Sequence, residues 1–417
     1  MFVDGTNFDV EELVIDLYYW FDKSTKRKNE LQSFCIFCDI SYKSLVKHIT
    51  TRWLSLEIAV DRALKQLPGL ISYFMSNDCA QAQFKRLKTA LENPMAEVYL
   101  LFYQATLPAF THANKFLQRE EPMFHLLKAH LLHLYKRLLG KFVKPTEISA
   151  NLNNLSSIDY TDICNQVEDR ELAIGFTTRQ TVMKLFNEGS INKQSLSKFY
   201  KSVRQFFTSA MDYLIMWCPL GDEILDHAVW IDFERKLDVT FNSVEYFVGC
   251  FPSILGDINR DNLNEQFLQY QFMSINDLPE NLKEACHYTD DDHPCRIDAL
   301  WSYLRTVNTP GTKIPQFDLL FRVAETILTI PHSNASEERI FSYISKCKTP
   351  SRSSLHLDGS LSSIMVLKTH ISDPLEWKPT KEKAKRSYMA VQQNKEAELK
   401  LLCICLLRVH LFFLHVH

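Results

Sequence analysis

Apolar residues recur every three or four positions over long stretches of this chain, and glycine is scarce. The 417 residues contain 10 glycines, and 46% are hydrophobic. From residue 95 to 143 the apolar spacing continues through most of the segment, and Pro108 and Pro122 mark kinks or breaks. A repeat near 3.6 residues places such side chains on one face of a helix, whereas a strand needs strict alternation. The sequence therefore predicts a mainly α-helical protein.

Other segments show the same helical spacing. The clearest follows Asn7, where apolar residues from Phe8 to Phe21 share one face. Further helices are predicted at 54–66, 193–217, 241–255 and 263–275, with a stop at Pro68-Gly69, a loop at 151–169 and one short strand at 46–50.

Charge and cysteine usage narrow the class of protein. The chain has 47 Lys and Arg residues against 50 Asp and Glu, so its net charge of -3 gives no whole-chain argument for nucleic-acid binding. The cysteine count of 11 is odd and no charged-then-apolar leader follows Met1, which favours a reducing, intracellular setting.

An apolar run at Leu401–Val416 is interrupted by Arg408, His410 and His415. It is shorter than the roughly 20 residues that a bilayer-spanning helix needs. We therefore expect residues 373–417 to be a charged linker followed by an apolar tail, with no membrane partner.

Two groups of cysteine and histidine residues contain candidate metal ligands. Cys35-x-x-Cys38 with His48 supplies three ligands, one fewer than a structural zinc site uses. Cys286-His287 with His293-x-Cys295 supplies four, but adjacent Cys and His side chains on a helix point apart. We predict no metal and no cofactor. The basic segment Thr25–Lys28 is either a nuclear-import signal or a solvated helix end.

The C-terminal third contains three short amphipathic segments. The first ends at Ile330-Pro331, and Asn334 with Glu337 fits a capping box that begins the second. The third is predicted at 358–371. Their apolar faces contain Phe317, Leu320, Phe321, Ala324, Ile327 and Leu328, then Ile340, Phe341 and Ile344, then Leu361, Ile364 and Met365.

These residues carry a family resemblance. The run from Ile330 to Ser342, followed by 346–354 and 361–371, resembles the C-terminal dimerisation region of hAT-superfamily transposases. The segment 48–55, which contains Arg52 and Trp53, looks like the Arg-Trp motif of that family. Residues 117–122 are similar to the helical insertion of zinc-finger proteins derived from such transposases.

The resemblance implies an RNase H-like core interrupted by a large helical insertion, with three acidic residues that bind catalytic metal. In the family, the first two acids lie on or near strands that come before the helix matched by Phe8–Phe21. Only seven residues come before that helix here, so only the third acid has a match, at Glu338. One carboxylate cannot hold two cations about 4 Å apart. The alternative role for Glu337 and Glu338 is stabilisation of a helix N-terminus. We therefore expect no enzymatic activity.

The resulting domain prediction has four parts. A partial RNase H-like core fragment spans 1–58, a helical insertion 59–295, the hAT dimerisation region 296–372, and the linker and tail 373–417. Trp53 is expected either near a nucleic-acid channel or as a plug between the core fragment and the insertion.

The sequence is compatible with three functions. The first is a non-enzymatic, transposase-derived protein that dimerises with itself or with a related hAT-derived protein through the apolar faces at 317–328, 340–344 and 361–367. Packing of these faces within one chain is the alternative. The second is weak residual DNA binding along Lys115, Arg119, Lys128, Lys136, Arg137, Lys141 and Lys144. The third is a truncated product without an independent role. Nuclear localisation is implied by the resemblance.

Overall fold

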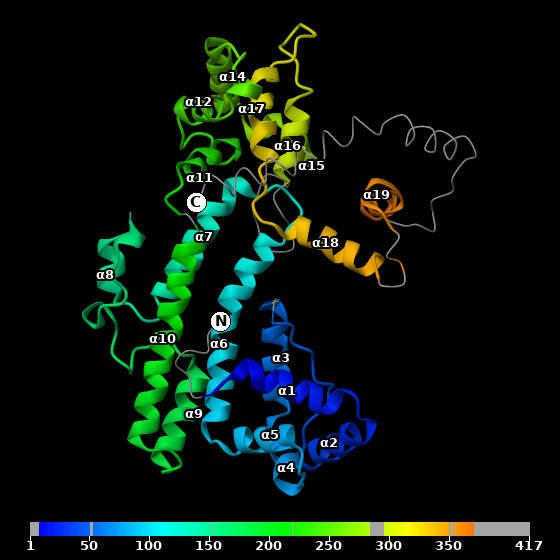
Figure 1. The fold of residues 1–417 in the computed structure, drawn as a ribbon. Helices are drawn as coiled ribbons and strands as arrows, with labels where there is room; N and C mark the ends of the chain where they lie inside the picture. Colours follow the sequence, from blue (N-terminus) through cyan, green and yellow to red (C-terminus); the bar gives the residue numbers. More distant parts are fainter. Residues whose placement is uncertain are drawn as a thin grey trace. The chain divides into compact units, whose positions relative to one another are not determined.

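The computed structural model describes residues 8–50, 53–152, 154–218, 220–283, 296–349, 352 and 355–370. Within these residues the regular structure is helical, and β-type pairing is limited to two isolated bridges, Val143–Gln166 and Asn308–Pro315. The predicted mainly α class is confirmed. The chain divides into two compact units, Met1–Ala335 and Ser336–His417, which are described separately (Figure 1).

The first ten helices share one hydrophobic core that extends from Phe8 to Met211. Figure 1 shows them in blue to green. They are α1 (Val10–Asp22), α2 (Thr25–Phe37), α3 (Trp53–Lys65), α4 (Leu67–Ser76), α5 (Ala82–Glu92), α6 (Met95–Leu117), α7 (Phe124–Leu139), α8 (Pro145–Ala150), α9 (Phe176–Asn187) and α10 (Lys193–Trp217).

Local sequence explains where several of these helices begin. Asp9, Ser24 and Asn192 accept hydrogen bonds from backbone N–H groups in the first turns of α1, α2 and α10. Gly69 allows α4 to approach α2, because a Cβ atom at this position would lie 2.8 Å from Cys35 Sγ. These caps and contacts fix the element boundaries that the apolar periodicity alone leaves open.

A second core within the first unit is built from the helices that follow. They are α11 (Glu223–His227), the 3₁₀ helix η3 (Ala228–Ile231), α12 (Phe241–Cys250), α13 (Pro252–Leu255), α14 (Arg260–Phe272), α15 (Glu280–Lys283), α16 (Ile297–Leu304) and α17 (Asp318–Leu328). Phe124 at the start of α7 also belongs to this core. Helices from both sides of residue 295 thus bury their apolar faces together.

The second unit contains α18 (Ala335–Cys347), which begins at the unit boundary, a π-helical turn η7 (Leu357–Leu361) and α19 (Ser362–His370). Leu361 is buried. None of the helices in the described parts of the chain combines the length and the apolar character needed to cross a bilayer. The tail 373–417 lies outside the described residues.

The strand predicted at 46–50 is absent, because residues 40–49 form an irregular segment with a turn at Thr50. Side-chain bonds hold this segment in place. His48 Nδ1 lies 2.8 Å from Ser55 Oγ, and the Ile49 N–H donates to the same hydroxyl at 3.1 Å. A strand needs a neighbouring backbone to pair with, and no strand is found in the described residues. The RNase H-like assignment of residues 1–58 is not confirmed and stays a prediction, as do the domain boundaries at 58, 295 and 372.

The structure places the proline and glycine residues that the sequence singled out. Pro108 lies inside α6 without ending it, and Pro68 occupies the first turn of α4. The first helical turn tolerates proline because its N–H would have no intrahelical partner. Pro68-Gly69 therefore separates two helices by starting the second. The predicted break at Pro122 is confirmed, since α6 ends at Leu117 and α7 begins at Phe124.

Candidate self-association surface

The apolar face of α17 is buried inside the chain. Phe317 is 2% exposed and Leu320 is 0% exposed, and both belong to the second core. Phe321 is partly buried, with the Arg305 guanidinium 5.0 Å from its ring centroid. For Phe317 and Leu320 the arrangement is therefore packing within one chain, which is the alternative that the sequence left open. Their predicted part in a dimer contact stays a prediction.

Helix α14 also supplies hydrogen-bond partners for the first turn of α17. Gln266 Oε1 accepts hydrogen bonds from the N–H groups of Leu319 and Leu320, at 3.0 and 2.9 Å. Its amide nitrogen donates to Asp318 Oδ1 at 2.6 Å. These bonds satisfy N–H groups that have no partner within a helix, and they fix α17 against α14. Sequence reasoning missed Gln266, because nothing in its local pattern indicates a cap for a helix about 50 residues away.

Helix α16 is buried in the same core. Trp301 is fully buried, and its indole N–H donates to the carbonyl oxygen of Ile231 at 3.0 Å. The Tyr270 hydroxyl donates to the same oxygen at 3.2 Å. Trp230 lies 5.4 Å from Trp301 in an edge-on arrangement. Ile297, Leu300, Trp301 and Leu304 are thus buried together on one face of α16.

Helix α18 presents a different environment. Ile340 is 40% exposed and Phe341 is 60% exposed, while Ile344 is half-buried. Their spacing places Ile340 and Ile344 one turn apart, with Phe341 beside them. Ile364 and Met365 of α19 are half-buried, and Leu361 before it is buried. Of the predicted dimerisation residues, Ile340 and Phe341 are the most accessible.

Three further residues of the predicted stretches 340–344 and 361–367 are accessible, although none was singled out. Val366 and Leu367 of α19 are exposed. Tyr343 of α18 lies between two lysines, with Lys346 Nζ 5.9 Å and Lys368 Nζ 5.5 Å from its ring centroid. The Lys368 contact joins α18 to α19. The run Ile364–Leu367 is continuously apolar, and helical spacing alone did not single out Val366 and Leu367 within it.

The structure also places the other acidic and motif residues. Glu337 and Glu338 lie in the first turn of α18, as expected, and Glu338 is exposed. A carboxylate here interacts favourably with the helix dipole. Among the described residues no group of three His, Cys, Asp or Glu side chains is arranged to hold a metal ion. Arg52 lies outside the described residues, and Trp53 is the first residue of α3. The role of this Arg-Trp pair stays a prediction.

The cysteines and histidine of the first considered metal site are engaged separately. Cys35 Sγ lies 3.9 Å from Gln66 Oε1, and Cys38 Sγ lies 3.4 Å from Ser72 Oγ. His48 Nε2 is 3.1 Å from Glu11 Oε1. Cys286, His287, His293 and Cys295 lie outside the described residues.

The basic segment at 25–28 does not end a helix; it forms the first turn of α2. The Arg27 guanidinium lies 3.6 Å from the Trp20 ring centroid and donates to the Trp20 carbonyl oxygen. Lys28 donates to the Asp22 carbonyl oxygen at 2.6 Å. Ser24 caps the new helix, which explains why the charges follow so closely on α1.

The predicted basic stripe is divided among several partners. Lys128 pairs with Asp226, and Lys144 donates to the Cys164 carbonyl oxygen at 2.6 Å. Burial, and next the neighbouring Arg137, lower the pKa of Lys141. Charges held in this way are less available to phosphates, and DNA binding stays a prediction.

Comparison with known families decides the identity of the C-terminal helices. Residues 300–371 match the family model described as the hAT family C-terminal dimerisation region. The C-terminal part of the chain is therefore similar to an hAT dimerisation region. This supports an hAT-superfamily, transposase-derived protein, as the sequence motifs predicted. Searches of curated proteins and of solved structures each found no match. The matched hAT region starts in the buried helix α16 and continues to the end of α19.

Proposed function

We propose that this chain is a non-enzymatic, transposase-derived protein that forms a homodimer through α18 and α19. The observation that carries the proposal is the exposure of Ile340 and Phe341 on α18, inside a segment that matches a dimerisation region. Removal of such apolar area from water favours association, although part of this gain is offset by the entropy lost when two chains associate. The rest of the predicted stripe, on α17, is already covered within the chain.

A two-fold arrangement suits this surface. In a two-fold dimer the same patch of each copy contacts its equivalent, so one apolar face is sufficient. A stable interface usually buries about 800 Å² on each partner, which is more than one face of a 13-residue helix provides. Val366 and Leu367 on α19 extend the area. We therefore propose that both helices contribute.

The test is light scattering coupled to size exclusion on the full chain over a range of concentrations. The wild type should elute as a dimer, and Phe341→Asp should elute as a monomer with unchanged helical content. Phe272→Asp is the matched control, because Phe272 is 85% exposed on α14 and lies outside the hAT region. Its dimer should persist. A wild type that stays monomeric at micromolar concentration would contradict the proposal.

A second binding partner would be recognised by mixing. If this chain pairs with a related hAT-derived chain instead of with itself, differently tagged copies of this chain will not co-purify with each other.

Ile344→Asp, at the half-buried edge of the same face, should weaken association less than Phe341→Asp.

The absence of catalysis has its own assay. We expect no nicking of supercoiled plasmid above background with Mg²⁺ or Mn²⁺, because phosphoryl transfer by two metals needs several converging oxygen ligands. Glu338→Gln is the control variant. Nicking by the wild type that disappears in Glu338→Gln would overturn the non-enzymatic assignment.

Nuclear localisation is proposed from the family resemblance. A fluorescent fusion should accumulate in the nucleus. Replacement of Lys26, which is solvent-exposed and part of the 25–28 segment, should leave this unchanged if the segment serves α2 rather than import.

A further inference from the structure

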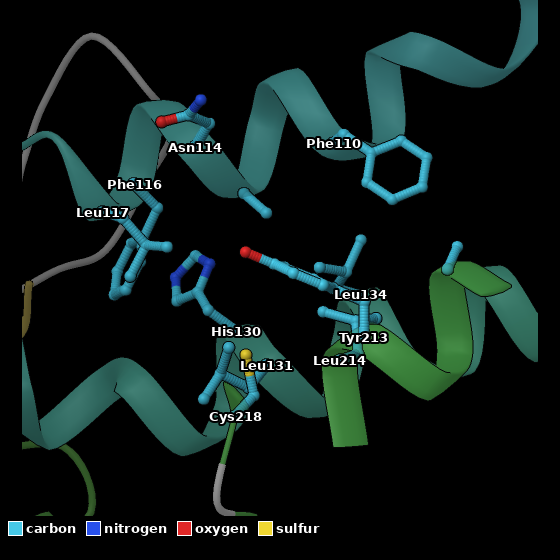
Figure 2. Close-up of a pocket in the computed structure, with 12 residues that line it drawn as sticks. Phe110, Asn114, Phe116, Leu117, His130, Leu131, Leu134, Tyr213, Leu214 and Cys218 are labelled. Carbon is cyan, nitrogen blue, oxygen red and sulfur yellow. The ribbon is translucent and has the colours of Figure 1, made fainter. Parts of the chain in front are cut away.

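A cavity of about 260 Å³ lies between α6, α7 and α10. Figure 2 shows its walls, with Phe110 and Phe116 from α6, Leu131 and Leu134 from α7, and Leu214 from α10. Two alanines, Ala113 and Ala210, also line it, and their small side chains leave the space open. Spaces between the helices of a bundle are frequent sites for small apolar ligands.

Four of the lining residues carry polar groups, and they are Asn114, His130, Tyr213 and Cys218. His130 and Asn114 line it, and the His130 ring stacks on Phe116 with 3.7 Å between centroids. His112 lies 6.2 Å from His130 and 6.3 Å from His133, measured between ring centroids. No Asp or Glu is among the residues that line the cavity. Imidazole, amide and phenol groups can each donate a hydrogen bond and no carboxylate opposes them, so the lining can hold an acceptor or an anion.

The mouth of the cavity continues into exposed apolar surface on the last turns of α10. Tyr213 lines the cavity and is 42% exposed, and Trp217 is 65% exposed with its ring 6.2 Å from that of Tyr213. This surface belongs to the first unit. An apolar ligand longer than the cavity could extend along it.

We propose that this cavity binds a small amphiphilic carboxylic acid, with its apolar body between the three helices and its carboxylate at the His130 and Asn114 edge. Burial of the apolar body supplies binding free energy in proportion to area. Charge-assisted hydrogen bonds from imidazole or amide N–H groups hold the carboxylate and set the orientation. The proposal does not depend on dimerisation.

The test uses the full chain and two ligands that share an apolar chain but differ in the head group. Octanoate and 1-octanol are titrated against a bound neutral fluorescent probe, N-phenyl-1-naphthylamine. Octanoate should displace the probe at about tenfold lower concentration than 1-octanol, which corresponds to about 1.4 kcal/mol. His130→Leu should remove this advantage and leave 1-octanol displacement unchanged.

Filling the cavity provides the second arm. Ala210→Phe places a ring in the space and should weaken both ligands by about tenfold or more. Because Ala210 is only 2% exposed, this variant is checked for folding by its melting temperature. Ala113→Phe, at a half-buried position on the opposite wall, decides the matter if Ala210→Phe does not fold.

Phe176→Ala serves as the control for binding to exposed rings, since Phe176 is 77% exposed on α9 and does not line the cavity. It should bind both ligands as the wild type does. Equal displacement of the probe by octanoate and 1-octanol would overturn the proposal. Probe displacement that neither Ala210→Phe nor Ala113→Phe reduces would overturn it as well.

Discussion

Helices α17 and α18 follow each other in the sequence of the hAT region, and both carry an amphipathic pattern of similar spacing. Their environments differ: Leu320 of α17 is 0% exposed, whereas Phe341 of α18 is 60% exposed. The face of α17 is covered by helices from residues 225–282, and Gln266 of α14 caps its first turn. The difference shows that an apolar stripe within a dimerisation region is not by itself an interface.

The first prediction contrasts the two faces directly. Leu320→Ala should lower the free energy of unfolding by about 2–5 kcal/mol, because it leaves a cavity in the second core. Urea unfolding followed by tryptophan fluorescence measures this change, since Trp230 and Trp301 lie in that core.

The matched substitution on the other helix is Phe341→Ala. It should change the stability of the monomer by less than about 0.5 kcal/mol, while weakening self-association. Equal losses of stability for the two variants would mean that α18 is as well covered as α17, and the comparison would fail.

The second prediction concerns pH and the covered part of the molecule. His125 of α7 is 2% exposed, and neither ring nitrogen has a hydrogen-bond partner among the described residues. Burial, followed by repulsion from His332 and Arg235, lowers its pKa to about 3. The pKa of His332 is also lowered, chiefly by burial.

Below about pH 6.5 the unfolded chain therefore binds a proton at residue 125 that the folded chain rejects. The contribution of neutral His125 to the free energy of unfolding is complete above pH 6.5 and is lost progressively as the pH falls toward 3. At pH 5 the loss from His125 is about 2 kcal/mol. Unfolding at pH 7 and pH 5 should show a smaller decrease for His125→Leu than for the wild type. An identical decrease in both proteins would show that this imidazole is accessible.

The smallest expected effect lies in the second unit. Tyr343→Leu removes the aromatic ring near Lys346 and Lys368, contacts worth about 0.5–1 kcal/mol at exposed sites. Hydrogen exchange in α19 should accelerate, while exchange in α17 should not change. Unchanged exchange in α19 would show that the Lys368 contact does not hold the two helices together.

The helical segments were largely predictable from sequence. The predicted helix at 193–217 is α10, and that at 54–66 differs from α3 by one residue at each end. These predictions succeeded because a 3.6-residue repeat is a local property of the chain. The strand at 46–50 failed, since strand formation depends on a neighbouring strand that short-range patterns cannot supply.

The site was less predictable than the fold. Ile340 and Phe341 lie on α18 with the spacing that the sequence indicated, and their part in dimerisation stays a prediction, whereas Glu338 lies in the first turn of α18 as expected. Phe317 and Leu320 show the same apolar spacing but face the interior. Gln266, Tyr343 and the cavity beside His130 depend on residues from different helices, so no single segment signals them.

The sequence by itself determined the helical class, the approximate helix positions and the motifs that identify the hAT region. Those features follow from the spacing and identity of residues close together in the chain. Only the tertiary structure decided that α17 is covered by α12 and α14, and that α16 packs on α14 and η3, while Ile340 and Phe341 remain accessible. The physical reason is that apolar periodicity states which face of a helix avoids water, whereas the partner that covers this face is set by packing between distant segments.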